Sequence, residues 1–495
     1  MHELQHWVGG KEWPGAGRRT AEVFDPATGA VARVVPLADA TDVGVAVDSA
    51  REAFPQWRDT PVGRRARVLF AFREIAERNA ADLARTVSAE HGKVVSDALG
   101  EVARGLEVVE FACGIPHLLK GGYSEQVSTD TDVHSIRQPL GVCVGITPFN
   151  FPVMVPMWMC AGAIAVGNCF ILKPSEKDSG ASLLLAETFK DAGLPDGVFQ
   201  VVQGDKVVVD RILDHPDVKA VSFVGSTPIA KYVYSTASAN GKRVQALAGA
   251  KNHMIVLPDA DVGMAADAAV SSVYGSSGER CMAIATVVPV GDIAEPLMEA
   301  ILERTANVKV GDGMDPESEM GPLVTREHRD KVASYLDGAR EQGASVLVDG
   351  REHPLWGTGF FFGPSVIDHV TTDMDCYKDE IFGPVMTVVR VDTYDDAIGL
   401  IERNPWGNGA AIFTRDGGAA RRFQFDVQVG MVGINVPIPV PLAFYSFGGW
   451  KSSLFGAAKM YGPEGIRFWT NEKAVTVRWP DPATSKVDLG FPGAR

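Results

Sequence analysis

The sequence predicts an α/β protein with two large domains, each built on a parallel sheet, and a small additional β element. Short apolar runs alternate with helix-like runs at residues 169–172, 181–191, 199–202, 206–214 and 220–224. A second alternating region covers residues 254–440. Strands that alternate with helices at this spacing form parallel, doubly wound sheets. A chain of 495 residues is also too long for a single core.

The composition is that of an ordinary globular protein, with 46% apolar and 22% charged residues. The cysteine pattern described below favours a reducing compartment. The formal net charge of −15 argues against nucleic acid and anionic membranes as partners. Six cysteines without a CxxC pair argue against a disulfide framework and against a zinc site. We find no secretory signal and no apolar run of about 18 residues, and therefore expect a cytoplasmic protein without a membrane span.

The region before the alternation is mainly helical. A turn at residues 25–29 links short β-like pieces, and Thr41 with Asp42 is positioned to cap the first helix. A helix is expected over residues 95–113, with Leu99, Val102, Leu106, Val109 and Cys113 on one face.

Arg104 falls on the opposite side of this helix, beside the apolar residues Val108 and Phe111. Considered alone, it is a surface arginine that pairs with Glu101 or Glu107.

Two strand-like segments stand apart from the alternating regions. Residues 133–144 contain Pro139, which places that segment at a sheet edge or between two strands. Residues 474–479 are also strand-like. We expect them to pair with residues 133–144 or with another subunit.

The segment around Cys281 is the first candidate for chemistry. Small residues at 275–278 let the backbone bend sharply. Arg280 directly precedes the thiol, and a neighbouring cation lowers a cysteine pKa and favours the nucleophilic thiolate. The alternative is that Cys281 is a buried small hydrophobic residue, as most free cysteines are.

Three other motifs favour ligand binding, although each also occurs without a ligand. Asn150 stands between two aromatic residues and two prolines, so its amide is a good oxyanion donor; losing such a donor costs about 2.7–4 kcal/mol in a transition state. Lys173 and Glu176 follow a strand, where an acid accepts bonds from ribose hydroxyls and repels a 2′-phosphate. Ser226 begins a helix whose free N–H groups can bind phosphate. Without a ligand, the Asn150 motif would be an ordinary loop turn, Lys173 and Glu176 a surface ion pair, and Ser226 an ordinary helix cap.

In order along the chain, these motifs resemble the NAD(P)-dependent aldehyde dehydrogenase superfamily over nearly its whole length. The motifs are PFNFP (148–152), KPSE (173–176), FVGST (223–227), GAK (249–251), GERC (278–281), EIFGP (380–384) and FGGWKS (447–452). The resemblance implies a Rossmann-type cofactor domain at residues 1–132 and 145–250 and a catalytic domain at 251–440. It also implies a return segment at 441–470, oligomerisation strands at 133–144 and 471–495, and a homodimer or homotetramer.

The resemblance also assigns roles to residues. Cys281 would be the nucleophile, and the Asn150 side chain with the Cys281 N–H would hold the oxyanion. The residues that would bind the cofactor are Lys173 and Glu176 at the adenosine ribose, Ser226 at the pyrophosphate, Glu380 and Phe382 at the nicotinamide ribose, and Phe149.

One position departs from the superfamily pattern. Most members carry a glutamate four residues before the GAK-type lysine, where it activates water, but this chain has Leu247. Leucine cannot take a proton, so the acyl group needs another acceptor, and a thiol needs less help from a base than water does.

Residues 250–253, 278–283 and 433–441 resemble the methylmalonate-semialdehyde dehydrogenase branch, which transfers its acyl group to coenzyme A. That branch usually has Asn at position 247 and a Pro-Met-Phe run near residues 442–445. It converts methylmalonate or malonate semialdehyde, with NAD and CoA, to propionyl-CoA or acetyl-CoA. Arg104 and Arg280 would then grip the substrate carboxylate.

Two alternatives remain from the sequence. One is a hydrolytic NAD-dependent dehydrogenase for another carboxylated aldehyde, such as succinate semialdehyde. The other is a non-catalytic protein with the same fold.

Overall fold

Two central sheets organise the chain, which the computed structural model describes over residues 2–483 and 486–487. The first sheet consists of β22 (Leu454–Phe455), β12 (Arg243–Leu247), β11 (Val218–Val224), β8 (Val142–Ile146), β9 (Cys169–Lys173), β10 (Phe199–Val201), β2 (His6–Val8) and β3 (Lys11–Trp13), in that order. From β12 to β10 all neighbours are parallel. Every residue of β8 and β9 is buried, as expected for parallel strands covered on both faces.

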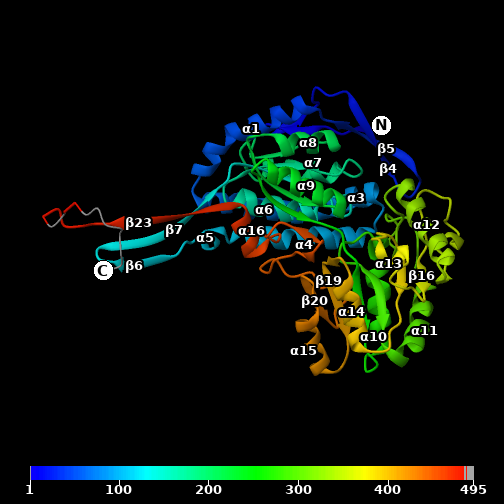
Figure 1. The fold of residues 1–495 in the computed structure, drawn as a ribbon. Helices are drawn as coiled ribbons and strands as arrows, with labels where there is room; N and C mark the ends of the chain where they lie inside the picture. Colours follow the sequence, from blue (N-terminus) through cyan, green and yellow to red (C-terminus); the bar gives the residue numbers. More distant parts are fainter. Residues whose placement is uncertain (1, 484–485, 488–495) are drawn as a thin grey trace.

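The second sheet consists of β15 (Ser345–Val348), β16 (Ser365–Asp368), β17 (Val385–Val388), β14 (Ile284–Pro289), β13 (Asn252–Val256), β19 (Gly409–Phe413) and β20 (Met431–Ile434). All its pairs are parallel except β15 with β16. Figure 1 shows the two sheets in separate lobes, the first above the second. The predicted pair of parallel sheets is therefore confirmed.

Helices cover both sheets. Those of the first lobe are α1 (Ala40–Asp59), α2 (Val62–Arg78), α3 (Ala80–His91), α4 (Val95–Cys113), α5 (Ile115–Leu118), α6 (Met154–Ala165), α7 (Gly180–Asp191), α8 (Lys206–Asp214), α9 (Thr227–Ala239) and α16 (Gly462–Phe468). Those of the second are α10 (Val262–Tyr274), α11 (Ala294–Thr305), α12 (Arg326–Glu341), α13 (Asp375–Lys378), α14 (Tyr394–Arg403) and α15 (Gly417–Asp426). No helix in the described ranges is long and apolar enough to cross a membrane.

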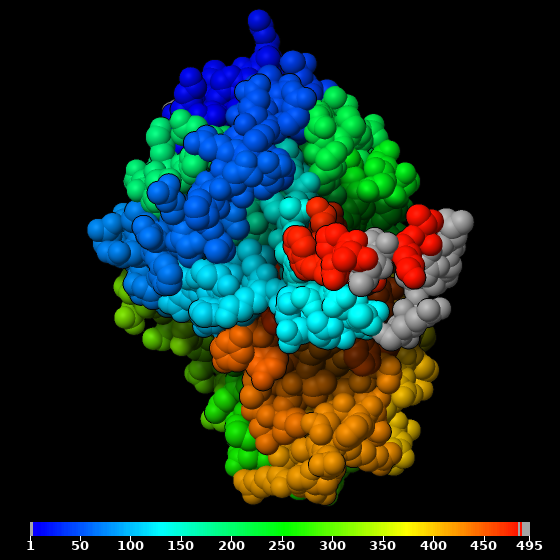
Figure 2. Space-filling model, turned by 90° about the vertical axis from the view of Figure 1, so that its left-hand side faces the viewer, coloured from blue at the N-terminus to red at the C-terminus, as the bar shows by residue number. Residues whose placement is uncertain are grey.

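Small sheets complete the fold. β1 (His2–Glu3), β5 (Ala30–Leu37) and β4 (Arg19–Asp25) form one, and β18 (Trp406–Gly407) pairs with β21 (Trp450–Lys451). β23 (Thr470–Arg478), β7 (Thr131–Pro139) and β6 (Tyr123–Ser128) form an arm that projects from the first lobe (Figure 1). Seen from the arm's side, its cyan and red residues lie between the blue-green lobe and the orange lobe (Figure 2).

The arm confirms one strand prediction and corrects another. β23 pairs antiparallel with β7 from Thr470↔Pro139 to Arg478↔Thr131, as expected for the two isolated segments. Residues 133–144 form two strands, which confirms the alternative that Pro139 lies between two strands: Pro139 ends β7, and β8 begins at Val142 inside the first sheet. Residues 142–144 therefore belong to the first sheet and not to the arm. The return of the chain to the first lobe after residue 441 is present, since β22 pairs with β12.

Two details of the predicted helices were wrong. Asp39, not Thr41 or Asp42, caps α1: its carboxylate accepts from the N–H groups of Thr41 and Asp42, and Asp42 accepts from the N–H of Asp39 in return. On α4 the side chain of Leu99 is 41% exposed, because the buried face is centred on Val102, Val109 and their neighbours.

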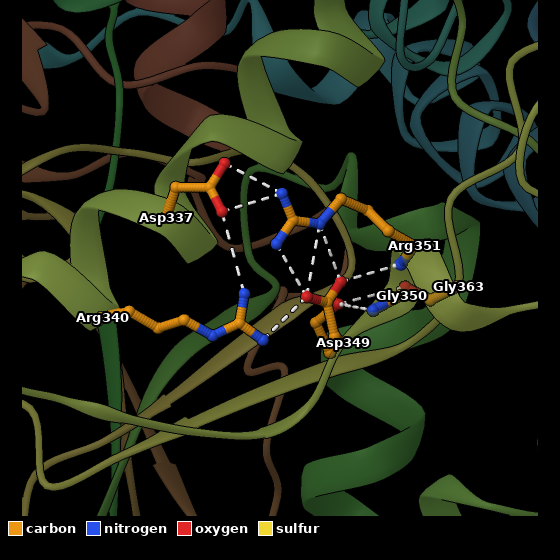
Figure 3. Close-up of polar contacts among 7 residues, drawn as sticks. Asp337, Arg340, Asp349, Gly350, Arg351 and Gly363 are labelled. Carbon is orange, nitrogen blue, oxygen red and sulfur yellow. Dashed lines mark hydrogen bonds and ion pairs between the residues drawn. The ribbon is translucent and has the colours of Figure 1, made fainter.

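A cluster of ion pairs fastens α12 to the edge strand β15 (Figure 3). Asp349, just after β15, accepts from Arg340 of α12 at 2.9 Å and from Arg351 at 2.7 Å, and Arg351 reaches Asp337 of α12 at 2.9 Å. Hydrogen bonds from Arg351 lower the pKa of Asp349 to about 2. Each arginine is matched by an acid, so this cluster stabilises the lobe and offers no unmatched charge to a ligand.

Candidate active site

Cys281 lies where two cavities meet. One cavity, of about 350 Å³, is bordered by α4, α6 and the chain near Val440, and we call it the substrate-side cavity. The other, of about 220 Å³, is bordered by Phe149, Ser226 and Phe382, and we call it the cofactor-side cavity. A thiol between two cavities can contact a different molecule on each side.

The backbone before Cys281 has the sharp bend that the small residues predicted. The short 3-10 turn η1 (Gly275–Gly278) contains Ser276, Ser277 and Gly278, with φ of +52°, +53° and +74°. A Cβ on Gly278 would lie 2.2 Å from the carbonyl oxygen of Gly383, so only glycine fits there. Strained residues of this kind persist where surrounding structure fixes them, and they concentrate at functional sites.

Two asparagines hold the carbonyl of Cys281. The amides of Asn252, at the start of β13, and Asn408, after β18, donate to this oxygen at 3.0 Å and 3.1 Å. They fix the main chain at the nucleophile from two different elements. Neither residue was given a role from the sequence, because nothing local marks a contact with a residue that is 29 positions away for Asn252 and 127 for Asn408.

Asn150 lies beside this segment, as the oxyanion hypothesis requires. Its side chain is buried, and its amide donates to the carbonyl oxygen of Glu279 at 2.8 Å. An amide nitrogen carries two N–H groups, so one remains for a ligand at the Cys281 side.

A buried ion pair supports the loop that carries Asn150. The Lys93 ammonium lies 2.9 Å from the Glu101 carboxylate, and both side chains are fully buried. Lys93 also donates to the carbonyl of Asn150, and Glu101 accepts from the N–H groups of Val153 at 2.7 Å and Met154 at 3.1 Å, where α6 begins. Removing one partner of such a pair typically costs about 3–5 kcal/mol. Sequence reasoning missed both roles.

The two arginines border the substrate-side cavity together with Cys281. Arg104 pairs with Glu107 at 2.6 Å, which confirms one of its two expected partners, and it donates to the carbonyl of Pro441 at 3.0 Å. Arg280 pairs with Asp97 at 2.5 Å.

The prediction that Arg280 makes Cys281 a thiolate is wrong in this structure. The pKa of Cys281 is raised to about 12, first by burial and second by the negative charge of Glu380; the field of Arg280 lowers it by less. The physical reason is that burial disfavours any charged form, and that Asp97 offsets much of the guanidinium charge.

The residues expected at the cofactor lie around the other cavity or lead to it. Ser226 stands at the N-terminus of the 13-residue helix α9 and borders the cavity. Lys173 ends β9, which β8 separates from the strand before α9, and it pairs with Glu176 at 3.1 Å; neither residue lines the cavity itself. A helix N-terminus suits a pyrophosphate and an acid beyond a strand suits ribose hydroxyls, so this donor set fits a dinucleotide.

Phe149, Glu380 and Phe382 line the same cavity near Cys281. The rings of Phe149 and Phe382 meet edge to face at 5.9 Å. Glu380 accepts from the N–H of Ala250 at 2.9 Å, and burial raises the pKa of Glu380 to about 7. His328 and Lys331 also border this cavity and were missed from the sequence.

Leu247 is buried at the end of β12, so the position of the superfamily glutamate holds an apolar side chain. Among the described residues, Glu380 is the acid whose negative charge raises the pKa of the Cys281 thiol.

Comparison with known proteins agrees with this geometry. The model of the aldehyde dehydrogenase family matches residues 13–475. The malonate-semialdehyde dehydrogenase of Pseudomonas aeruginosa is 51% identical over 99% of this chain and 100% of its own length. An acylating methylmalonate-semialdehyde dehydrogenase of Arabidopsis thaliana is 46% identical over 95% of this chain and 78% of its own length.

Solved structures agree as well. The crystal structure of the methylmalonate-semialdehyde dehydrogenase of Oceanimonas doudoroffii superposes with a TM-score of 0.96 at 52% identity, covering 98% of this chain and 99% of that one. A Sinorhizobium meliloti structure complexed with NAD gives a TM-score of 0.96 at 51% identity, with the same coverage.

The thiol pKa of about 12 gives a first prediction. In the protein without added ligands, the rate of Cys281 alkylation by iodoacetamide should rise about tenfold per pH unit from pH 7 to 10, because the thiolate fraction does so below the pKa. Mass spectrometry of the Cys281 peptide measures this rate, with Cys281→Ala as the control. A plateau with a midpoint below pH 9 would contradict the neutral thiol.

Proposed function

The chain belongs to the aldehyde dehydrogenase family, and we propose that it oxidises malonate semialdehyde or methylmalonate semialdehyde with NAD and transfers the acyl group to coenzyme A. The products are acetyl-CoA or propionyl-CoA, and the substrate carboxyl group is lost. The observation that carries this proposal is the combination of two arginines in the Cys281 cavity with Leu247 in place of a hydrolytic base.

The reaction begins at Cys281. Its sulfur attacks the aldehyde carbon, and the amide of Asn150 with the N–H of Cys281 stabilises the oxygen as it becomes negative. The residues of the cofactor-side cavity would hold NAD, which when bound would supply the hydride acceptor. The result on the protein is a thioester at Cys281.

The thiol must first lose its proton, and Glu380 is the group with a suitable pKa of about 7 on the cofactor side. Glu380 raises the pKa of the Cys281 thiol while it is charged, so protonation of Glu380 makes the thiolate less costly.

Substrate and cofactor are held from opposite sides. Arg104 and Arg280 bind the substrate carboxylate, since guanidinium groups match carboxylates in shape and charge. Ser226 and the start of α9 bind the pyrophosphate, and Lys173 and Glu176 bind the adenosine ribose. Phe149, Glu380 and Phe382 enclose the nicotinamide end. The carboxylate of Glu176 favours NAD over NADP, because it repels a 2′-phosphate.

Release of the acyl group follows from Leu247. A buried leucine cannot deprotonate water, so the thioester persists until a better nucleophile arrives. The thiol of CoA ionises much closer to neutral pH than water does and needs little help.

One observation favours a second candidate, a hydrolytic dehydrogenase for another carboxylated aldehyde. Glu380 has a pKa of about 7 and lies in the same cavity as Cys281, so it is a base that could replace the missing glutamate. The requirement for CoA separates the two candidates.

We further propose a cytoplasmic homodimer or homotetramer. All six cysteines are free thiols, which suits a reducing compartment. Among the described residues, β20 and β23 each pair on one side only, and exposed edges of this kind favour strand pairing between chains. Ile434 of β20 and Ile136 of β7 are apolar and 39% exposed.

The association prediction is direct. Size-exclusion chromatography with light scattering at micromolar concentration should give two or four times the chain mass of 52.9 kDa. A species of one chain mass under these conditions would show that the edges stay unpaired.

The acyl-transfer prediction concerns turnover with and without CoA. With malonate semialdehyde and NAD alone, NADH should form in a burst of at most one per site and then slowly, since base catalysis contributes about 10²–10⁴-fold and is missing here. With CoA added, NADH should form continuously, at a rate at least about 100-fold above the slow phase seen without CoA. Cys281→Ala is the control without activity. Equal turnover to free acid without CoA would favour the hydrolytic candidate.

The carboxylate prediction concerns the two arginines. Arg104→Leu and Arg280→Leu should each lower the ratio of kcat/KM for malonate semialdehyde to kcat/KM for propanal by about 10–100-fold. This is the loss expected when one hydrogen bond to a charged group is removed. Arg64→Leu, at an exposed arginine of α2, is the matched control. If the ratio does not change in Arg104→Leu and Arg280→Leu, the two arginines do not bind the substrate carboxylate.

A further inference from the structure

Both arginines of the substrate-side cavity already have an acidic partner. Arg280 lies 2.5 Å from Asp97, and Arg104 lies 2.6 Å from Glu107. The side chains of Arg280 and Asp97 are only 22% and 18% exposed, so their attraction is weakly screened by water.

Only one of the two carboxylate oxygens of Asp97 has a hydrogen-bond partner among the described residues. Asp97 lies in the first turn of α4, and one carboxylate oxygen accepts from Arg280. The other oxygen is buried and has no hydrogen-bond partner among the described residues. A buried acceptor without a partner costs free energy, more so for a charged group, and an asparagine of the same shape would avoid part of that cost.

The charges around the cavity therefore nearly cancel. The Arg280 and Arg104 guanidinium groups are matched by Asp97 and Glu107, and the buried Lys93 is matched by Glu101. A carboxylate in this cavity meets two guanidinium groups but little net positive charge. It can be oriented by hydrogen bonds without being strongly held by charge.

This balance matters for the loss of the carboxyl group. In the malonyl thioester on Cys281, the bond between the carboxylate carbon and the central carbon breaks, and its electron pair moves into the thioester carbonyl to form an enolate. Neutral CO₂ leaves, and the enolate carbon takes a proton from water to give the acetyl thioester. The carboxylate loses its charge in this step, so a cation that binds this charge strongly stabilises the ground state more than the transition state.

We propose, on the basis of the function proposed above, that Asp97 is a positioning residue that limits the positive charge Arg280 presents to the substrate and so allows decarboxylation to precede acyl transfer. Asp97 acts through Arg280 and does not itself touch the reacting atoms. Glu107 does the same through Arg104, from a more exposed position.

The test compares the CoA thioesters made by the wild type and by Asp97→Asn from malonate semialdehyde, NAD and CoA. Asparagine keeps the shape and removes the charge. The ratio of malonyl-CoA to acetyl-CoA, measured by mass spectrometry, should rise at least about tenfold in Asp97→Asn, and KM for malonate semialdehyde should fall several-fold, because the unpaired guanidinium holds the carboxylate more strongly. Asp82→Asn, which removes an exposed acid paired with Arg85 on α3, is the matched control.

A product ratio equal to that of the wild type, with KM unchanged or raised, would overturn the proposal and leave Asp97 as a support for Arg280 only. If Asp97→Asn does not fold, Glu107→Gln provides the same test, with a smaller rise in malonyl-CoA expected because Glu107 is 37% exposed. A wild type that makes no CoA thioester at all would instead overturn the proposed function.

Discussion

The buried pair of Lys93 and Glu101 is the interaction on which the site depends. It joins three separate pieces of the first lobe: the chain before α4, the start of α6 and the loop that carries Asn150. Asn150 in turn donates to the carbonyl of Glu279, two residues before Cys281, so the pair helps to fix the position of Asn150 relative to Cys281. Two charges are held out of water because both are fully paired and hydrogen-bonded, and either one alone would be costly.

Burial also sets the chemistry of the reacting groups. It raises the pKa values of both Cys281 and Glu380, which keeps the thiol neutral and brings the carboxyl close to neutral pH. The charges near Cys281 are therefore largely offset. Asp97 and Glu107 pair with Arg280 and Arg104, and Glu380 is about half protonated near neutral pH. In the function proposed above, such a site would bind a carboxylated aldehyde without trapping it, and the absence of a base at Leu247 would decide which molecule removes the acyl group.

Local patterns in the sequence predicted the parallel sheets, the motifs around the two cavities and several helices, among them those at residues 95–113, 181–191 and 206–214. They worked because strand–helix alternation and short motifs depend on neighbouring residues. They failed where contacts between residues far apart in the sequence determine the burial or the pKa of a side chain. Arg280 beside Cys281 predicts a thiolate, but its partner Asp97 is 183 residues away and burial outweighs the remaining field. Lys93 and Glu101 look like surface charges until α4 and α6 pack together. The roles of Cys281, Asn150 and the cofactor residues stay predictions, supported by their positions.

The central claim is that Cys281 holds an acyl group which water cannot efficiently remove. Mass spectrometry of the intact protein after mixing with malonate semialdehyde and NAD, without CoA, tests it most directly. We expect the mass of one acetyl group to accumulate on Cys281 in most molecules and to disappear within a single turnover when CoA is added. Protein that stays unmodified while NADH forms continuously would contradict the account.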